Sequence, residues 1–260
     1  VRNGDIFLIF AAPNEFFMLR VKGILWAALS SSTFGLAPLF TLLLLGVGYS
    51  SFEVLTYRWG VASLCLGAYG LLAGCDFRLG RRELGTVFLL SLFRAATSLS
   101  LVIAYQNIAS GVASTIHFMY PLVVAVVMMC FFRERGSAWT FAAIGMSIVG
   151  AVLLSLGNVD FSHGDTTLGI VSATVSVVAY GGYIVGVRRS RAVEIDSTVL
   201  TCCVMAFGAL FFIAGGLLTG GVRLEADPHM WLYILGVAIP ATAVSNICLL
   251  YTSPSPRDGA

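Results

Sequence analysis

Three side chains that can carry a positive charge, Arg58, Arg94 and His117, lie inside long apolar stretches of the sequence. The Asp and Glu residues, by contrast, lie in polar breaks or near the ends of those stretches. Ionisable groups inside a bilayer are costly and are functional candidates by default. A guanidinium group can hold a carboxylate or a phosphate through paired hydrogen bonds. The pattern predicts a site for an anionic group, with Arg94 as its main residue.

Each of these three residues also has a purely structural explanation. Arg58 can extend to the outer membrane surface or pair with Glu53. Arg94 can tie its helix to carbonyl or hydroxyl groups of neighbouring helices, and His117 can be a neutral, hydrogen-bonded packing residue. The remaining candidates for solute binding are side chains with a hydroxyl group: Ser30, Thr97, Ser98, Tyr120, Tyr180 and Tyr183.

The composition indicates which elements must position these residues. The chain is 58% hydrophobic and 11% charged, with a mean hydropathy of +0.92, whereas a soluble domain is about half apolar and about a quarter charged. A transmembrane helix needs about 20 largely apolar residues. Eight segments meet this requirement, at about 23–46, 52–74, 84–107, 111–132, 138–157, 168–187, 198–219 and 230–250. We predict an all-α membrane protein, a polytopic helical bundle.

The basic residues are distributed unevenly between the connections of these segments. Eleven of them precede the first segment or lie in every second connection, and the opposite connections hold only Arg223. Lys and Arg are retained on the cytoplasmic side of a membrane during insertion. The pattern predicts a cytoplasmic N-terminus.

The segment Thr115–Phe132 carries His117 and Pro121 one helical turn apart. Pro121 cannot donate the backbone hydrogen bond that the His117 carbonyl would accept, so it bends the helix. Such breaks are tolerated in a membrane where they line a cavity, and we predict that this helix lines the solute pathway. Close helix contacts are the predicted role of four glycines: Gly35, Gly181, Gly182 and Gly186.

The sequence contains an internal repeat. An offset of 146 residues aligns segment 168–187 with the first segment and pairs Ser30 with Ser176, and an offset of 145 pairs Thr97 with Thr242. Inverted repeats are the architecture of secondary transporters, which bind substrate between the two halves. We predict two inverted five-helix units, at 18–157 and 168–247, with eight helices present of an expected ten.

The same segments resemble a known family. The stretches GILWAALSSSTFG, YRWG and AYQNIASGVASTIHFMYPLVV, followed by LGIVSATVSVVAYGGYIVGVRR, are similar to EamA-type transporters of the drug/metabolite transporter superfamily. The resemblance covers residues 19–247. It implies a ten-helix permease of the bacterial inner (cytoplasmic) membrane with both termini inside. It also implies transport of amino acids, small metabolites and other organic solutes, often outward.

The two ends of the chain depart from this pattern. Residues 1–17 precede Met18, and we interpret them as upstream read-through, with a weak signal peptide at 6–12 as the alternative. The tail at 248–260, CLLYTSPSPRDGA, resembles the translation of a sequencing-library adapter, and we interpret it as an artefact.

Three classes of function are compatible with such a bundle: a transporter, an enzyme, and a structural or sensory subunit. An enzyme needs a nucleophile with its base, paired acids or a metal set, whereas the Asp and Glu residues here lie in the connections or, like Glu53, at the end of an apolar segment. We predict a secondary transporter, and not an enzyme, that exports small organic metabolites such as amino acids or organic anions. A structural or sensory subunit without transport is the alternative, and a membrane enzyme is the least favoured. We expect no cofactor, metal ion or nucleic-acid partner; the partners are the lipid bilayer and the solute, and both a monomer and a homodimer stay open.

The charge distribution makes a topology prediction. The connection at 78–83 should be cytoplasmic and the connection at 160–165 external, because the first is basic and the second is acidic. In a cysteine-free variant, a single cysteine placed at 160–165 should react in intact cells with a thiol reagent that cannot cross membranes. A cysteine at 78–83 should not react, and its labelling in intact cells would overturn the topology.

Overall fold

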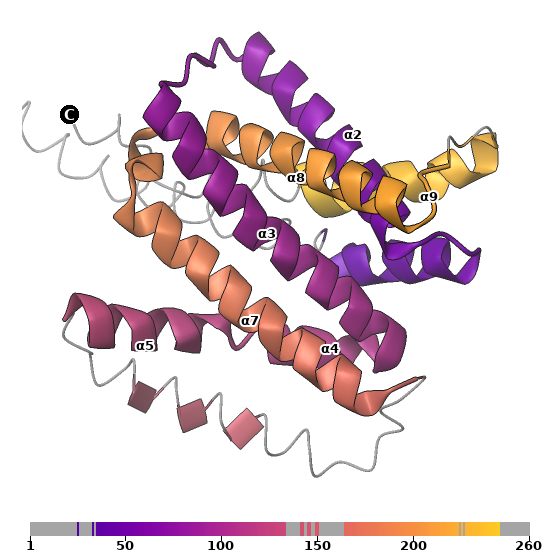
Figure 1. Cartoon of the computed structure of the whole chain (residues 1–260), viewed down its shortest axis with the longest axis horizontal. Helices are drawn as coiled ribbons and strands as arrows, with labels where there is room; N and C mark the ends of the chain where they lie inside the picture. The colour runs from indigo at the N-terminus through magenta and orange to yellow at the C-terminus, as the bar shows by residue number, and fades with distance from the viewer. Residues whose placement is uncertain are drawn as a thin grey trace, which may run out of the picture.

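The computed structural model describes residues 35–133 and 164–223 continuously, together with 25, 33, 141–142, 145–146, 149–150, 225 and 227–244. Our interpretations of 1–17, Ser30 and 248–260, and most of segment 138–157, lie outside these residues. The described part is helical and contains no β-strand (Figure 1). Its elements are a helix at Leu36–Gly46, α2 (Ser51–Leu72), α3 (Arg81–Asn107), α4 (Ser110–His117), α5 (Tyr120–Phe132), α7 (Thr166–Arg189), the 3-10 helix η1 (Arg191–Glu194), α8 (Ser197–Thr219), α9 (Pro228–Ala238) and the π-helix η2 (Ile239–Val244).

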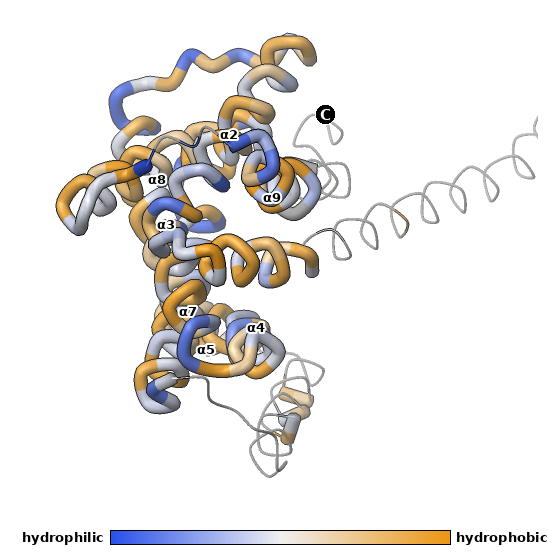
Figure 2. Tube along the Cα trace, turned by 90° about the vertical axis from the view of Figure 1, so that its right-hand side faces the viewer, coloured by the Kyte–Doolittle hydropathy of each residue, from blue (hydrophilic) through white to orange (hydrophobic). Residues whose placement is uncertain are grey.

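Four described spans are long and apolar enough to cross a membrane: α3, α4 with α5 (Ser110–Phe132), α7 and α8. The tube in Figure 2 is mostly hydrophobic along the helices, with hydrophilic stretches at their connections. Large apolar side chains are exposed on the outer faces, for example Leu64, Leu89, Val178 and Leu217. A soluble protein would bury such side chains, whereas lipid solvates them. The prediction of an all-α polytopic membrane protein is confirmed.

The centre of the bundle is the antiparallel pair of α2 and α8. Near one end of the pair, Phe52 of α2 packs on Gly215 of α8, and near the other end Gly70 of α2 faces Thr198. Midway, the ring of Trp59 lies directly on Gly208. The Trp59 side chain is 1% exposed and meets the ring of Phe212 edge to face, at 5.3 Å between centroids. These apolar contacts hold the two helices together.

The flanking helices repeat their contacts on both sides of this pair. Helix Leu36–Gly46 packs on α9, where Phe40 lies against Gly236. The corresponding contact on the other side joins α3 and α7, where Leu90 lies against Gly186. In the repeat alignment Phe40 corresponds to Gly186. In both contacts the bulky residue therefore comes from the first half of the chain, and the glycine comes from the second half.

A second layer, formed by α4, α5 and α7, covers the far side of α3 (Figure 1). The break predicted at Pro121 is present, because α4 ends at His117 and α5 begins at Tyr120, with Pro121 in its first turn. A proline is favourable there, since the first turn of a helix needs no donor from it. The two helices follow α7 in the same direction: His117 bonds Ser176 near the middle of α7, and Phe132 lies beside Arg189 at its end.

Acidic residues in the connections serve as helix caps. Asp165, Asp196 and Asp227 accept backbone N–H groups at the starts of α7, α8 and α9, which removes unpaired donors and complements the positive end of each helix dipole. The basic connections before α3 and after α5 and α7 lie at one end of the bundle, and the connection containing Arg223 lies at the other. The described structure therefore has the charge asymmetry that the sequence predicted; which end is cytoplasmic stays a prediction.

The contact between Trp59 and Gly208 predicts that a side chain at position 208 destabilises the protein. A Cβ atom at position 208 would overlap the indole ring, which is buried and cannot move aside. Gly208→Ala should therefore destabilise the protein by about 1–3 kcal/mol, seen as a lower melting temperature of the purified protein in detergent. Gly85→Ala on α3 is the matched control, because no atom lies within 4 Å of its Cβ position. Equal melting temperatures for the two variants would refute the close contact.

Candidate solute-binding site

A narrow pocket of about 20 Å³ lies between α2, α3, α4 and helix Leu36–Gly46. Its lining brings together all three charged candidates, Arg58, Arg94 and His117, from three different helices. Two further predicted residues, Thr97 and Ser98, line the same pocket. The described lining of this pocket contains no Asp or Glu. The volume admits about one water molecule or one small polar group.

Arg94 lies at the midpoint of α3, half-buried, with its guanidinium carbon among three aromatic rings. The distances to the ring centroids are 4.9 Å for Tyr180, 5.8 Å for Tyr183 and 6.0 Å for Trp59. Aromatic faces attract a cation, but they accept few of its hydrogen bonds. None of the described residues accepts a hydrogen bond from Arg94 or forms an ion pair with it. The structural role considered for Arg94, a hydrogen bond to carbonyl or hydroxyl groups of neighbouring helices, is therefore not observed in the described part of the chain.

The two structural alternatives for Arg58 are wrong. Its side chain is buried at 9% exposure, and its Nε donates to the Thr242 hydroxyl of η2 at 2.9 Å. Glu53 instead binds Arg223, with the Arg223 Nε 2.9 Å from its carboxylate, and caps its own helix through the Ser50 N–H. The reason is helical geometry: five residues of an α-helix turn through well over one revolution, so Glu53 and Arg58 point in different directions.

His117 is buried at 4% exposure and bonds across to α7, with its Nδ1 3.0 Å from the Ser176 hydroxyl. The rings of Tyr120 and Tyr180 lie 5.9 and 5.3 Å from the imidazole, and they contact each other at 4.5 Å. His117 is thus hydrogen-bonded, as the packing alternative predicted, and it lines the pocket, as the binding alternative predicted.

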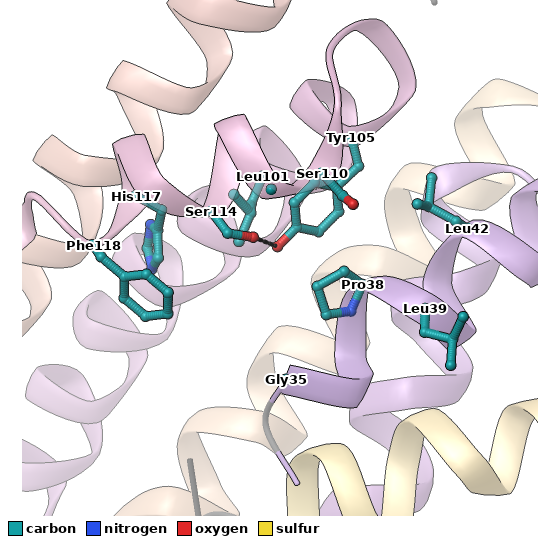
Figure 3. A pocket seen from close by; sticks show the side chains of 11 residues that line it. Gly35, Pro38, Leu39, Leu42, Leu101, Tyr105, Ser110, Ser114, His117 and Phe118 are labelled. Carbon is teal, nitrogen blue, oxygen red and sulfur yellow. Dashed lines mark hydrogen bonds between the residues drawn. The ribbon is translucent and has the colours of Figure 1, made fainter. Parts of the chain in front are cut away.

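A larger cavity of about 440 Å³ adjoins the narrow pocket (Figure 3). Helix Leu36–Gly46 forms one wall with Gly35, Pro38, Leu39 and Leu42, and α3 and α4 form the opposite wall. Apart from the His117 imidazole, the Ser110 hydroxyl and the Tyr105 and Ser114 hydroxyls, which lie 3.1 Å apart, the lining is largely apolar. The narrow pocket and the larger cavity share Leu101, Tyr105 and His117. Cavities of this size hold small organic ligands.

The predicted close helix contact of Gly35 is not found among the described residues: no described atom lies within 4 Å of its Cβ position, and it lines the larger cavity instead. The other three predicted glycines lie at helix contacts. A Cβ atom on Gly181 would meet Val123 of α5 at 2.9 Å, one on Gly182 would meet Phe93 at 3.1 Å, and one on Gly186 would meet Leu90 at 2.7 Å. These glycines let α3 and α5 approach α7, which brings Tyr180 and Tyr183 to Arg94.

Several residues of the site were not among the predicted ones. Leu101 and Tyr105 lie about two and three helical turns beyond Arg94 on its face of α3, a spacing that could have identified them. Ser176 could have been found as the counterpart of Ser30 in the repeat. Pro38, Leu39 and Leu42 carry no signal that separates them from other apolar residues in a membrane helix.

Residues 21–156, just over half of the chain, match the EamA-like transporter family. The chain belongs to this family. EamA-like proteins are membrane transporters of the drug/metabolite transporter superfamily, so the resemblance inferred from the sequence is confirmed, and the function class is that of a transporter family. The search of curated proteins finds no match.

Solved structures support the fold. One similar chain, described only as "Crystal structure of protein", has a TM-score of 0.59 and 16% sequence identity, over 90% of this chain and 77% of its own length. At this identity the similarity concerns the fold alone. The EamA-like chain described here is therefore a multi-pass membrane protein whose helices are arranged as in a structure known by experiment.

The hydrogen bond between Arg58 and Thr242 predicts that loss of the Thr242 hydroxyl destabilises the protein. Thr242→Val keeps the side-chain shape but removes the acceptor, which leaves a buried charged donor without that partner at a cost of about 1–3 kcal/mol. We expect a lower melting temperature. Thr174→Val on α7 is the matched control, because Thr174 is exposed and bonds only its own helix among the described residues. A melting temperature of Thr242→Val equal to that of the control would contradict a structural role for this bond.

Proposed function

We propose that this EamA-like protein is a secondary transporter of small organic solutes that carry an anionic group, such as amino acids and organic anions. The observation that carries the proposal is the convergence of Arg58, Arg94 and His117 on one pocket whose described lining includes no carboxylate.

Electrostatics supports an anionic solute. Two guanidinium groups in a poorly solvated pocket repel each other, and an isolated buried charge is strongly unfavourable. A carboxylate or phosphate between them would supply the missing counter-charge. No described residue accepts a hydrogen bond from the Arg94 guanidinium, so its N–H groups can donate to the anionic group of the solute. A guanidinium can hold a carboxylate or a phosphate through two hydrogen bonds. A cationic solute would meet repulsion at the same place.

The cavity dimensions support a small solute with one polar end. The narrow pocket has room for an anionic head group and little more, whereas the adjoining cavity of about 440 Å³ is largely apolar. A solute would place its charged head beside Arg94 and its remaining atoms against Pro38, Leu39 and Leu42. Relatives in this family often move solutes outward across the bacterial inner membrane, and export is the direction we propose here.

Arg94 provides the test of this function. Arg94→Ala should lower solute flux per folded molecule by about 10- to 100-fold, because a hydrogen bond to a charged group contributes about 1.5–3 kcal/mol. Arg94→Lys keeps the charge but loses the planar fork, so its flux should be intermediate. Flux of labelled amino acids and organic anions into proteoliposomes is the measurement, divided by the amount of monodisperse protein recovered.

The control is Arg82→Ala, which removes an exposed arginine from the first turn of the same helix. It should leave flux per molecule unchanged. If Arg94→Ala lowers the yield of folded protein but keeps normal flux per molecule, Arg94 has a structural role and the proposal for the anion fails.

A further inference from the structure

The hydrogen bonds of Ser176 determine which nitrogen of His117 carries the proton. A serine hydroxyl has a single proton to donate. The Ser176 hydroxyl donates it to the Ala173 carbonyl of its own helix, at 2.6 Å. It must therefore accept the bond that it shares with the His117 Nδ1 at 3.0 Å. Nδ1 is the donor of this bond and carries a proton.

The second ring nitrogen, Nε2, is then an acceptor. In a neutral imidazole one nitrogen donates and the other accepts, and two guanidinium groups beside the same pocket oppose a third positive charge there. None of the described residues donates a hydrogen bond to Nε2. His117 lines both the narrow pocket and the larger cavity, so among the described residues this acceptor is unpaired on a side chain that both share.

We propose that Ser176 is a positioning residue that holds His117 as the Nδ1–H tautomer, so that Nε2 accepts a hydrogen bond from the transported solute. This inference rests on the proposed function and adds a second requirement to it. The solute must carry an N–H or O–H donor close to its anionic head, as α-amino acids and α-hydroxy acids do. A simple carboxylate of the same shape leaves the buried acceptor unpaired.

The surroundings of His117 favour a charged amine as that donor. The rings of Tyr120 and Tyr180 flank the imidazole at 5.9 and 5.3 Å, and aromatic faces attract ammonium groups. The pocket thus has two parts that bind different groups of the solute. The guanidinium groups bind its anionic group, and the imidazole nitrogen with its aromatic neighbours binds its N–H or O–H group. Ser176 sets the second preference without touching the solute.

Nitrogen-15 NMR of the purified protein tests the tautomer directly. In protein labelled at its histidines, the signals that disappear in His117→Gln identify this ring, and we expect the pattern of a neutral ring protonated at Nδ1. Ser176→Ala should shift the ring to the Nε2–H tautomer or to a mixture, and Ser176→Thr should restore the wild-type pattern. Ser172→Ala, the same change one turn earlier on α7, is the control and should alter nothing. A wild-type ring that is protonated at Nε2 at neutral pH overturns the proposal.

Transport of matched solute pairs tests the consequence. Leucine and 4-methylpentanoate share a carbon skeleton and differ in the α-ammonium group, as do phenylalanine and 3-phenylpropanoate. For a transported pair, the wild type should show a KM about tenfold lower for the amino acid. In Ser176→Ala this ratio should approach one while the maximal flux is kept, and Ser176→Thr should recover it.

The outcomes separate this inference from the proposed function. Equal KM values for both members in the wild type overturn the role of His117 in selection, even though anions are transported. A Ser176→Ala variant that loses maximal flux but keeps the KM ratio shows a structural role for Ser176 and also overturns the proposal. Absence of flux for every anionic solute contradicts the proposed function, and the NMR result then decides the tautomer independently.

Discussion

The close packing of α2 on α8 is the contact on which the rest of the structure depends. Trp59 lies against Gly208 without an intervening side chain, so the two helices cross at a short distance and their flanks become accessible to α3 and α9. Arg58, one residue before Trp59, then points toward η2, while Arg94 on α3 comes within 6.0 Å of the Trp59 ring. A wider separation of α2 and α8 would move the two guanidinium groups apart.

The sequence predicted the helices well because each span must be a continuous apolar run that satisfies its own backbone hydrogen bonds. The predicted segment 84–107 lies within α3, and 198–219 matches α8 to within one residue. The break at Pro121 follows from proline chemistry alone. Arg94 and His117 were predicted by a similar local rule, because an ionisable side chain in an apolar span must face the bundle interior or a cavity. The structure brings both residues to one pocket.

The partners of these residues could not be predicted in the same way. Thr242 and Ser176 bind Arg58 and His117 from helices that are 184 and 59 residues away in the chain, and only the packing of the bundle brings them together. The predicted pairing of Arg58 with Glu53 was wrong because the helix turns the two side chains in different directions. The Glu53 carboxylate instead binds Arg223, which is 170 residues away in the chain. The cavity wall at Leu39 and Leu42 has the same apolar composition as a lipid-facing surface. Only the position of these residues in the folded bundle distinguishes them from lipid-facing residues.

The site is chemically one-sided although the scaffold is repeated. With the offset that aligns the second and third helices of the two halves, Arg58 and Arg94 correspond to Cys203 and Ile239. A symmetric site would gather four guanidinium groups near one axis, and their repulsion would outweigh what a single anionic head can neutralise. Instead, α7 contributes the uncharged Tyr180, Tyr183 and Ser176, which support the cations and orient the imidazole without adding charge. The departure from symmetry therefore leaves a positive pocket that one small solute can neutralise.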